Sequence, residues 1–253
     1  MTERKLGPQA GRVLVAEFAG SAMLVSVVVG SGIAARQLSP NDVGLQLLEN
    51  SIATALGLGV LILALGPVSG AHFNPVVSVA DWLLGRRSET GLGTRLLCLY
   101  VAVQTLGAIA GAILANVMFD RPAVEIATKE RASNGHFIAE VVATAGLIVV
   151  VFALARTGRA GLSAAAVGAY IGAAYWFTSS TSFANPAVTV GRMFSDTFAG
   201  IAPTSVAPFI AAQIIGGLIG LALTVYLYPD ASQTADQAVV AHGPPDNSDM
   251  EPT

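Results

Sequence analysis

Long apolar stretches dominate this chain of 253 residues and limit what it can fold into. A helix that crosses a bilayer needs about 20 mostly apolar residues, and windows here meet that requirement with no charge or a single isolated one. Only 11% of the residues are charged, whereas an average soluble domain has about 25%. We therefore predict an all-α membrane protein with six transmembrane helices at 13–35, 47–66, 96–119, 137–155, 162–177 and 206–228.

Charge and metal-binding residue types exclude several other classes of protein. The net charge is −3 and the chain has no long basic block, so we expect membrane lipid rather than nucleic acid as a partner. Cys98 is the single cysteine, and the three histidines lie far apart in the sequence. This spacing predicts no metal site, and we expect no cofactor. No set of nucleophile, base and orienting group indicates an enzyme.

The loops predict how the chain lies in its membrane. Six spans place both termini on one side, where eight basic residues fall, whereas five fall on the opposite side. Basic loops favour the cytoplasm, so we expect an integral protein of the inner or plasma membrane with both termini cytoplasmic. We assign 1–12 to a cytoplasmic segment, 13–228 to one membrane domain, and the acidic stretch 229–253 to a disordered cytoplasmic tail.

The membrane domain repeats itself. Residues 99–111 align with 208–220, so that Gln104 matches Gln213 and their glycines coincide, and Glu17 has a counterpart in Glu140. Each repeat, about 13–119 and 136–228, contains three spans. Because three is odd, the second repeat starts from the opposite face and the two repeats have inverted topology. The glycines, one helical turn apart, predict close helix contacts.

One short broken motif occurs in each repeat, as Ser-Gly-Ala-His-Phe-Asn-Pro-Val at 69–76 and Ser-Thr-Ser-Phe-Ala-Asn-Pro-Ala at 180–187. Asparagine is a preferred helix N-cap and proline a preferred first residue, so the motifs predict re-entrant half-helices at 76–85 and 187–194. Each asparagine amide would remain free to donate into a lumen. Ordinary surface turns are the alternative, but two copies at equivalent points of inverted repeats argue against it.

These motifs, together with the repeated glutamates, resemble those of the aquaporin and aquaglyceroporin family. The resemblance implies a passive channel for water and small neutral, glycerol-like solutes that excludes protons and ions. It also implies a homotetramer in which each protomer has its own pore and the two loops meet at mid-membrane. The implied pore residues are Asn74, Pro75, Val76, Asn185, Pro186 and Ala187 of the boxes, and Gly70, Ala71, His72, Phe73, Thr181, Phe183 and Ala184 of the loops.

The chain departs from the family pattern at two positions. Val76 stands where alanine is usual, and Val188 stands where many members carry the arginine of the selectivity filter. Arg192 follows four residues later, and we expect it one turn deeper, in a structural contact. Carried over by spacing, the filter consists of Thr54, Ala173, Ser182 and Val188, although alanine and valine could also be ordinary packing residues. Such a filter is wide and uncharged, and by analogy it admits glycerol and arsenous or antimonous acid.

Glu17 and Glu140 lie within apolar spans, where an unpaired charge is costly. They could act as proton or ion relays, or they could accept hydrogen bonds from the backbone of the re-entrant loops. The family resemblance implies the second role, as structural loop anchors. The main alternative function is an ion-coupled secondary transporter, since broken helices in inverted repeats also characterise that class.

Overall fold

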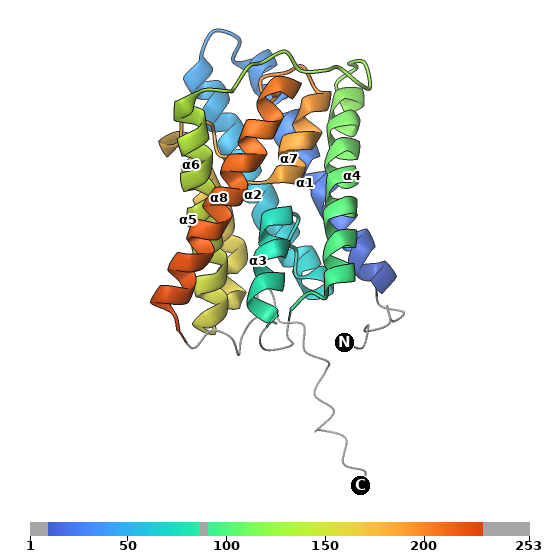
Figure 1. Ribbon diagram of the computed structural model, residues 1–253. Coiled ribbons are helices and arrows are strands. Elements are labelled where there is room, and N and C mark those ends of the chain that lie inside the picture. The colour runs from blue at the N-terminus through green and yellow to red at the C-terminus, as the bar shows by residue number, and fades with distance from the viewer. Residues whose placement is uncertain (1–9, 87–90, 230–253) are drawn as a thin grey trace.

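The computed structural model describes residues 10–86 and 91–229, and this part of the chain is helical without strands. Figure 1 shows long helices standing roughly side by side, with the short helix α3 in the lower half of the bundle and α7 in the upper half. The helices are α1 (Ala10–Leu38), α2 (Val43–Ser69), α3 (Pro75–Gly85), α4 (Thr94–Met118), α5 (Asn134–Arg156), α6 (Ser163–Phe177), α7 (Pro186–Gly191) and α8 (Pro203–Leu227), with 3₁₀ turns at Ala160–Leu162 (η1) and Arg192–Phe194 (η2).

The six predicted spans are confirmed. Six helices of the described residues are long and apolar enough to cross a membrane, and η1 with α6 forms the shortest of them. The first span begins at Ala10 rather than Val13, so the end of the predicted terminal segment is helical. Residues 1–9 and the predicted tail from 230 onward lie outside the described residues. Helix α1 begins and α8 ends at the same end of the bundle (Figure 1).

Both predicted half-helices form, and each begins at its asparagine. The Asn74 side chain accepts a hydrogen bond from the backbone N–H of Val76 and caps α3. The Asn185 side chain accepts from the N–H groups of Ala187 and Val188 and caps α7. Because proline follows each cap, its missing N–H falls where a helix has no internal partner for that group. The second half-helix is shorter than predicted, since it changes to the 3₁₀ turn η2 at Arg192.

The two halves of the bundle pack through matched pairs of helices. In the first half, α1 packs mainly against α4 and α2. In the second half, α5 packs mainly against α8 and α6, which are the counterparts of α4 and α2. Gly107 and Gly111 of α4 approach the backbone of α1 at Phe18 and Ala22 so closely that a Cβ on either glycine would overlap a carbonyl oxygen. Gly216 and Gly220 of α8 approach the backbone of α5 in the same way. The predicted close glycine contacts are confirmed.

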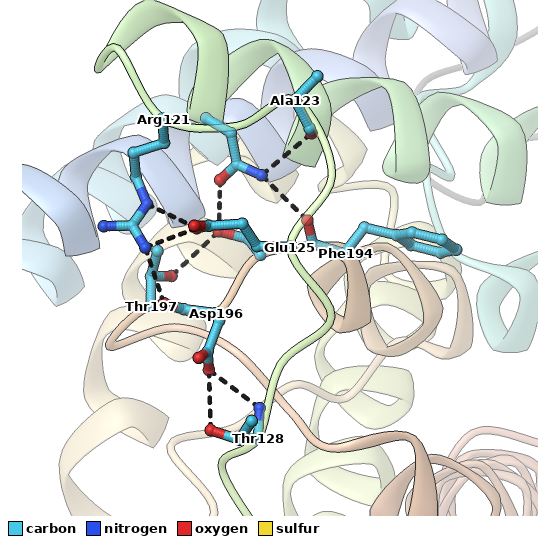
Figure 2. Close-up of polar contacts among 9 residues, drawn as sticks. Arg121, Ala123, Glu125, Thr128, Phe194, Asp196 and Thr197 are labelled. Atoms are coloured by element: carbon cyan, nitrogen blue, oxygen red, sulfur yellow. Dashed lines mark hydrogen bonds and ion pairs between the residues drawn. The ribbon is translucent and has the colours of Figure 1, made fainter.

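The loop between α4 and α5 lies across one end of the bundle and is bonded to the segment that follows α7 (Figure 1). Figure 2 shows these bonds: Arg121 pairs with Glu125 at 2.5 Å and also donates to the Asp196 carbonyl, while the Asp196 carboxylate accepts from Thr128. Asn116, at the end of α4, donates to the Phe194 carbonyl at 3.0 Å. The loop therefore fixes the position of the chain immediately after η2.

Gly20 of α1 provides a test of how tightly the first loop is packed. A Cβ at Gly20 would overlap the ring of Phe73, which is 1% exposed. We predict that Gly20→Ala lowers stability by about 1 to 3 kcal/mol, because neither the ring nor the helix has room to move. Gly11 of the same helix has nothing within 4 Å of an added Cβ, so Gly11→Ala is the matched control. Thermal unfolding of purified protein in detergent measures both, and equal stability of the two variants would contradict the prediction.

Candidate functional site: a cavity between two half-helices

The two re-entrant loops meet through reciprocal hydrogen bonds of their asparagines. The Asn74 amide nitrogen donates to the Ala184 carbonyl at 2.8 Å, and the Asn185 amide nitrogen donates to the Phe73 carbonyl at 2.7 Å. The expectation that both amides are entirely free is therefore wrong, because one N–H of each amide crosses to the other loop. The second N–H of each amide is the one that remains for a solute.

Glu17 binds the backbone of the first loop. One carboxylate oxygen accepts from the backbone N–H of His72 at 3.0 Å and from the Ser69 hydroxyl at 2.6 Å. The other oxygen accepts from the backbone N–H of Phe73 at 2.8 Å and from the Gln104 amide at 2.7 Å. Glu17 is fully buried, so these four donors replace the water that a carboxylate would otherwise bind.

Glu140 occupies the equivalent place in the second half. Its carboxylate accepts from the backbone N–H groups of Phe183 at 2.9 Å and Ala184 at 2.8 Å, and from the Gln213 amide at 2.7 Å. The side chain is fully buried. Neither Glu17 nor Glu140 lines the cavity described below. Their bonds correspond to the structural anchors that the sequence analysis favours rather than to a relay.

The loop backbones adopt left-handed conformations at matching positions. Ala71 and Phe73 have φ values of 49° and 48° in the first loop, and Ser182 and Ala184 have the same values of 49° and 48° in the second. Residues with side chains rarely adopt this conformation, which costs of order 1 to 3 kcal/mol. The bonds to the glutamates hold the loops in this shape.

A cavity of about 60 Å³ lies where the loops meet. Its polar lining residues include both asparagines, His72 from the first loop and Ser182 from the second, and many of the other lining residues are aliphatic. Helices from both halves contribute, so the cavity is closed only when the two halves are packed together. The complete lining is Leu24, Val28, Thr54, Leu58, Ile62, Ala71, His72, Phe73, Asn74, Val77, Leu147, Val151, Val167, Ile171, Tyr175, Ser182, Phe183, Asn185, Val188 and Arg192.

Three of the four positions expected to form the filter line this cavity: Thr54, Ser182 and Val188. Ala173 does not, because it lies on the exposed face of α6. Tyr175, two residues later, turns inward instead, and its hydroxyl lies 3.1 Å from that of Thr54. The expectation for Ala173 is corrected to Tyr175, so the cavity wall carries a phenol where a methyl group was expected.

The boxes contribute less to the wall than expected. Pro75, Val76 and Pro186 face away from the cavity and line an apolar groove beside α4 and α8. A Cβ on Gly217 of α8 would overlap Val76, so the valine fills space that this glycine leaves open. The alanine-to-valine change at position 76 therefore does not alter the cavity wall. Among the remaining expected pore residues, Gly70, Thr181, Ala184 and Ala187 are also absent from the lining.

Arg192 lies in a different place from the one that the sequence predicts. Helix α7 starts at the loop contact in the centre and runs toward the end covered by the α4–α5 loop, whose Ala127 donates to the Met193 carbonyl. Arg192 is thus one turn nearer the mouth, not deeper. The expected loop contact exists, since its Nε donates to the Ala199 carbonyl at 2.5 Å. The arginine also lines the cavity, so a charged side chain lies beside the mostly uncharged positions expected to form the filter.

Arg131, from the α4–α5 loop, is a second buried guanidinium nearby. Its nitrogens donate to the carbonyls of Gly200 at 2.9 Å, Phe198 at 3.3 Å and Ser180 at 3.4 Å. It lies 5.0 Å from the Phe183 ring centre. Burial lowers the pKa of Arg131 to about 10, so this guanidinium remains charged at neutral pH. The sequence did not indicate this role, because a basic residue in a long loop has no pattern that points inward.

The comparisons with known proteins agree with this geometry. The major intrinsic protein profile matches residues 7–182. The chain belongs to the major intrinsic protein family. An aquaglyceroporin of Rhizobium meliloti, AqpS, is 46% identical over 220 residues, which cover 87% of this chain and 91% of that protein. Rat aquaporin-2 is 30% identical and covers 95% and 88% of the two chains.

A solved structure shares the fold. The crystal structure of an aquaglyceroporin from Plasmodium falciparum superposes with a TM-score of 0.63 at 17% identity, over 88% of this chain and 99% of the other. The predicted fold class of six spans and two half-helices, and the family resemblance, are confirmed. As a member of this family with six apolar spans, the protein is an integral membrane protein.

The glutamate anchors lead to a prediction about stability. Glu140→Ala removes the acceptor of three donors. We expect a loss of about 1 to 3 kcal/mol for each donor left unpaired, and therefore a low yield of folded protein. Glu49→Ala is the control, since within the described residues that carboxylate accepts one hydrogen bond, from Ser39, and bonds to neither re-entrant loop. Yield after gel filtration in detergent measures the difference. A Glu140→Ala protein that folds normally and loses only pH-dependent transport would establish the relay instead.

Proposed function

We propose that the protein is a passive channel for water and small neutral solutes of the glycerol type. The observation that carries the proposal is the pair of reciprocal asparagine bonds, which bring two capped half-helices to one cavity. The names of similar proteins, aquaglyceroporin and aquaporin, agree with this function. Passage down a gradient needs no cofactor.

The cavity wall supports a preference for hydroxylated solutes. The lining combines donors and acceptors on Asn74, Asn185, Ser182 and Tyr175 with aliphatic groups such as Leu147. A polyol has hydroxyl groups on one edge and C–H groups on the other, so it can exchange hydration for these polar groups while its carbon chain contacts the apolar wall. Few convergent polar groups in an apolar cavity bind a small solute weakly and allow its release.

The same arrangement opposes cations and protons. The amino ends of α3 and α7 meet at the cavity, and the amino end of a helix carries a partial positive charge. A water molecule between the two asparagine donors turns its oxygen toward them, so its hydrogens cannot complete a chain for proton transfer. Cations and protons are therefore excluded while neutral molecules pass.

The ion-coupled transporter is the less favoured candidate. Coupling would require several oxygens or carboxylates that converge on the transport path. Glu17 and Glu140 are the acidic residues closest to the loops, and both carboxylates bind backbone N–H groups outside the cavity lining. The cavity lining in the described part of the chain contains no carboxylate.

We further propose a cytoplasmic location for both termini and a homotetrameric assembly. The excess of basic residues on the terminal side supports the orientation. Helix α2 supports an interface with a neighbour, because only 22% of its most apolar window is buried within the protomer. Large apolar side chains that face outward on it include Ile52, Leu56, Val60 and Leu63.

The first test of the proposal measures flux into proteoliposomes by stopped-flow light scattering. We expect water and glycerol fluxes that rise in proportion to their gradients and exceed those of empty liposomes, with no change when a proton gradient is imposed. The passive pore offers no step that a proton gradient could drive. Saturable uptake that follows a pH or sodium gradient would support the transporter instead.

A second test concerns the width of the channel at Val188. Replacement by arginine would add a long charged side chain one turn from Arg192, in the same cavity wall. We expect Val188→Arg to lose glycerol and arsenous acid permeability and to retain some water flux, because the larger solutes need the space that valine leaves. Val76→Ala is the matched control, since Val76 faces the apolar groove. Equal conduction of all three solutes by parent and Val188→Arg would show that position 188 does not limit passage.

A further inference from the structure

Arg192 and Val188 are successive positions on one wall of the cavity. The backbone N–H of Arg192 donates to the Val188 carbonyl, which places the two residues one helical turn apart. One turn corresponds to a rise of about 5.4 Å along a helix. Both side chains line the cavity, and both are at most 5% exposed. The Arg192 guanidinium therefore lines the same part of the cavity as the uncharged Val188 side chain. It lies one turn closer to the end of the bundle that the α4–α5 loop covers.

The Arg192 side chain is held by two contacts that leave its outer nitrogens unused. Its Nε donates to the Ala199 carbonyl, and its guanidinium lies 3.4 Å from the centre of the Phe183 ring. In the described part of the chain, its two Nη atoms have no hydrogen-bond acceptor. Within the same residues no carboxylate forms an ion pair with it. Among the described residues, Arg192 thus has no ion-pair partner in contact with it, and its Nη atoms present free N–H donors.

Ser182 provides an independent sign that this end of the cavity receives a ligand. Its hydroxyl is buried, and no group within the described residues hydrogen bonds to it. Other buried hydroxyl groups of the described residues also lack a partner, but Ser182 is the one whose residue lines the cavity, so its hydroxyl is placed to bond a solute there. Ser182 precedes Phe183 in the second loop, and both line the cavity with Arg192.

Arg131 provides a comparison within the same molecule. It is also buried and also lies over Phe183, but its nitrogens donate to backbone carbonyls and it does not line the cavity. Of these two guanidiniums, only Arg192 is placed to contact a permeating solute. Arg131 instead holds together the α4–α5 loop, the second re-entrant loop and the segment 198–200.

We propose that Arg192 is the charge-selective residue of the channel and that, with Ser182, it binds neutral hydroxylated solutes at the outer end of the cavity. This inference rests on the proposed channel function. The guanidinium repels small cations in a medium where charges are weakly screened. Its free N–H groups donate to a solute hydroxyl oxygen, and the Ser182 hydroxyl donates to or accepts from the next one. Arg192 thereby selects against charge, while Val188, one turn away, leaves the channel wide. Two different residues determine these two properties.

The experiment compares Arg192→Met with Arg131→Met in proteoliposomes. Urea and guanidinium form the probe pair, because they are nearly equal in size and differ in charge. We expect parent and Arg131→Met to pass urea and glycerol and to exclude guanidinium. Arg192→Met should pass guanidinium at least tenfold faster than the parent and should bind glycerol more weakly, seen as a smaller block of water flux by glycerol. Arg131→Met should lower the melting temperature without admitting guanidinium.

One further variant keeps the test decisive if Arg192→Met fails to fold. Val188→Asp leaves Arg192 in place and puts a carboxylate one turn away, which neutralises it, so the same guanidinium leak is expected. Where Arg192→Met does fold, Val188→Arg combined with Arg192→Val moves the charge back by one turn and should exclude guanidinium again, unlike Arg192→Met.

The outcomes separate this inference from the proposed function. A parent that passes no neutral solute would overturn both. A parent that passes glycerol, with Arg192→Met or Val188→Asp still excluding guanidinium, would overturn the role of Arg192 alone. An equal leak in Arg131→Met would do the same, because it would show that general loosening, and not the cavity-facing charge, is responsible.

Discussion

The fold depends on satisfying the backbone N–H groups of two loops that are not helical and lie inside a membrane protein. Hydrocarbon offers these groups no partner, and each unsatisfied one costs several kcal/mol by order of magnitude. The chain supplies Glu17 and Glu140, each of which accepts two loop N–H groups and one glutamine amide. Glutamate at these positions is a consequence of the broken backbone, and the left-handed residues of the loops depend on it.

The two loops are anchored alike at their glutamates and differently elsewhere. Ser69 and its counterpart Ser180 both accept from the backbone N–H two residues later, but Ser69 also donates to Glu17, whereas the Ser180 hydroxyl lies 3.5 Å from that of Thr178. The second loop has a further support, because Arg131 binds the Ser180 carbonyl and both Arg131 and Arg192 lie over Phe183. The two repeats therefore share their glutamate anchors but produce a cavity whose two ends differ in chemistry. Arg192 is the one arginine among the lining residues, and it lies at one end.

Features with a local cause could be predicted from the sequence. The spans follow from apolar length, and the caps at Asn74 and Asn185 follow from what asparagine and proline do at a helix start. Which side chains of a helix face the cavity could not be predicted, because contacts with neighbouring elements decide it. Ala173 and Tyr175 lie on one short helix, and only packing against α2 decides which of them faces Thr54. Val76 faces α8 because Gly217 leaves room there. Arg192 faces inward because Ala199, in a loop without pattern, accepts its Nε bond.

The reciprocal asparagine bonds also bear on how the protein is made. Asn74 finds its acceptor on Ala184, which is 110 positions later in the chain. During synthesis, the first loop can bind Glu17, and Gln104 can donate to the same carboxylate, as soon as α4 is in place, since these residues all belong to the first half. Asn74 nevertheless cannot form its hydrogen bond to the Ala184 carbonyl until the second loop has inserted from the opposite side. The first half therefore lacks this contact until the second re-entrant loop has been made, and α3 gains its contacts with α8 later still.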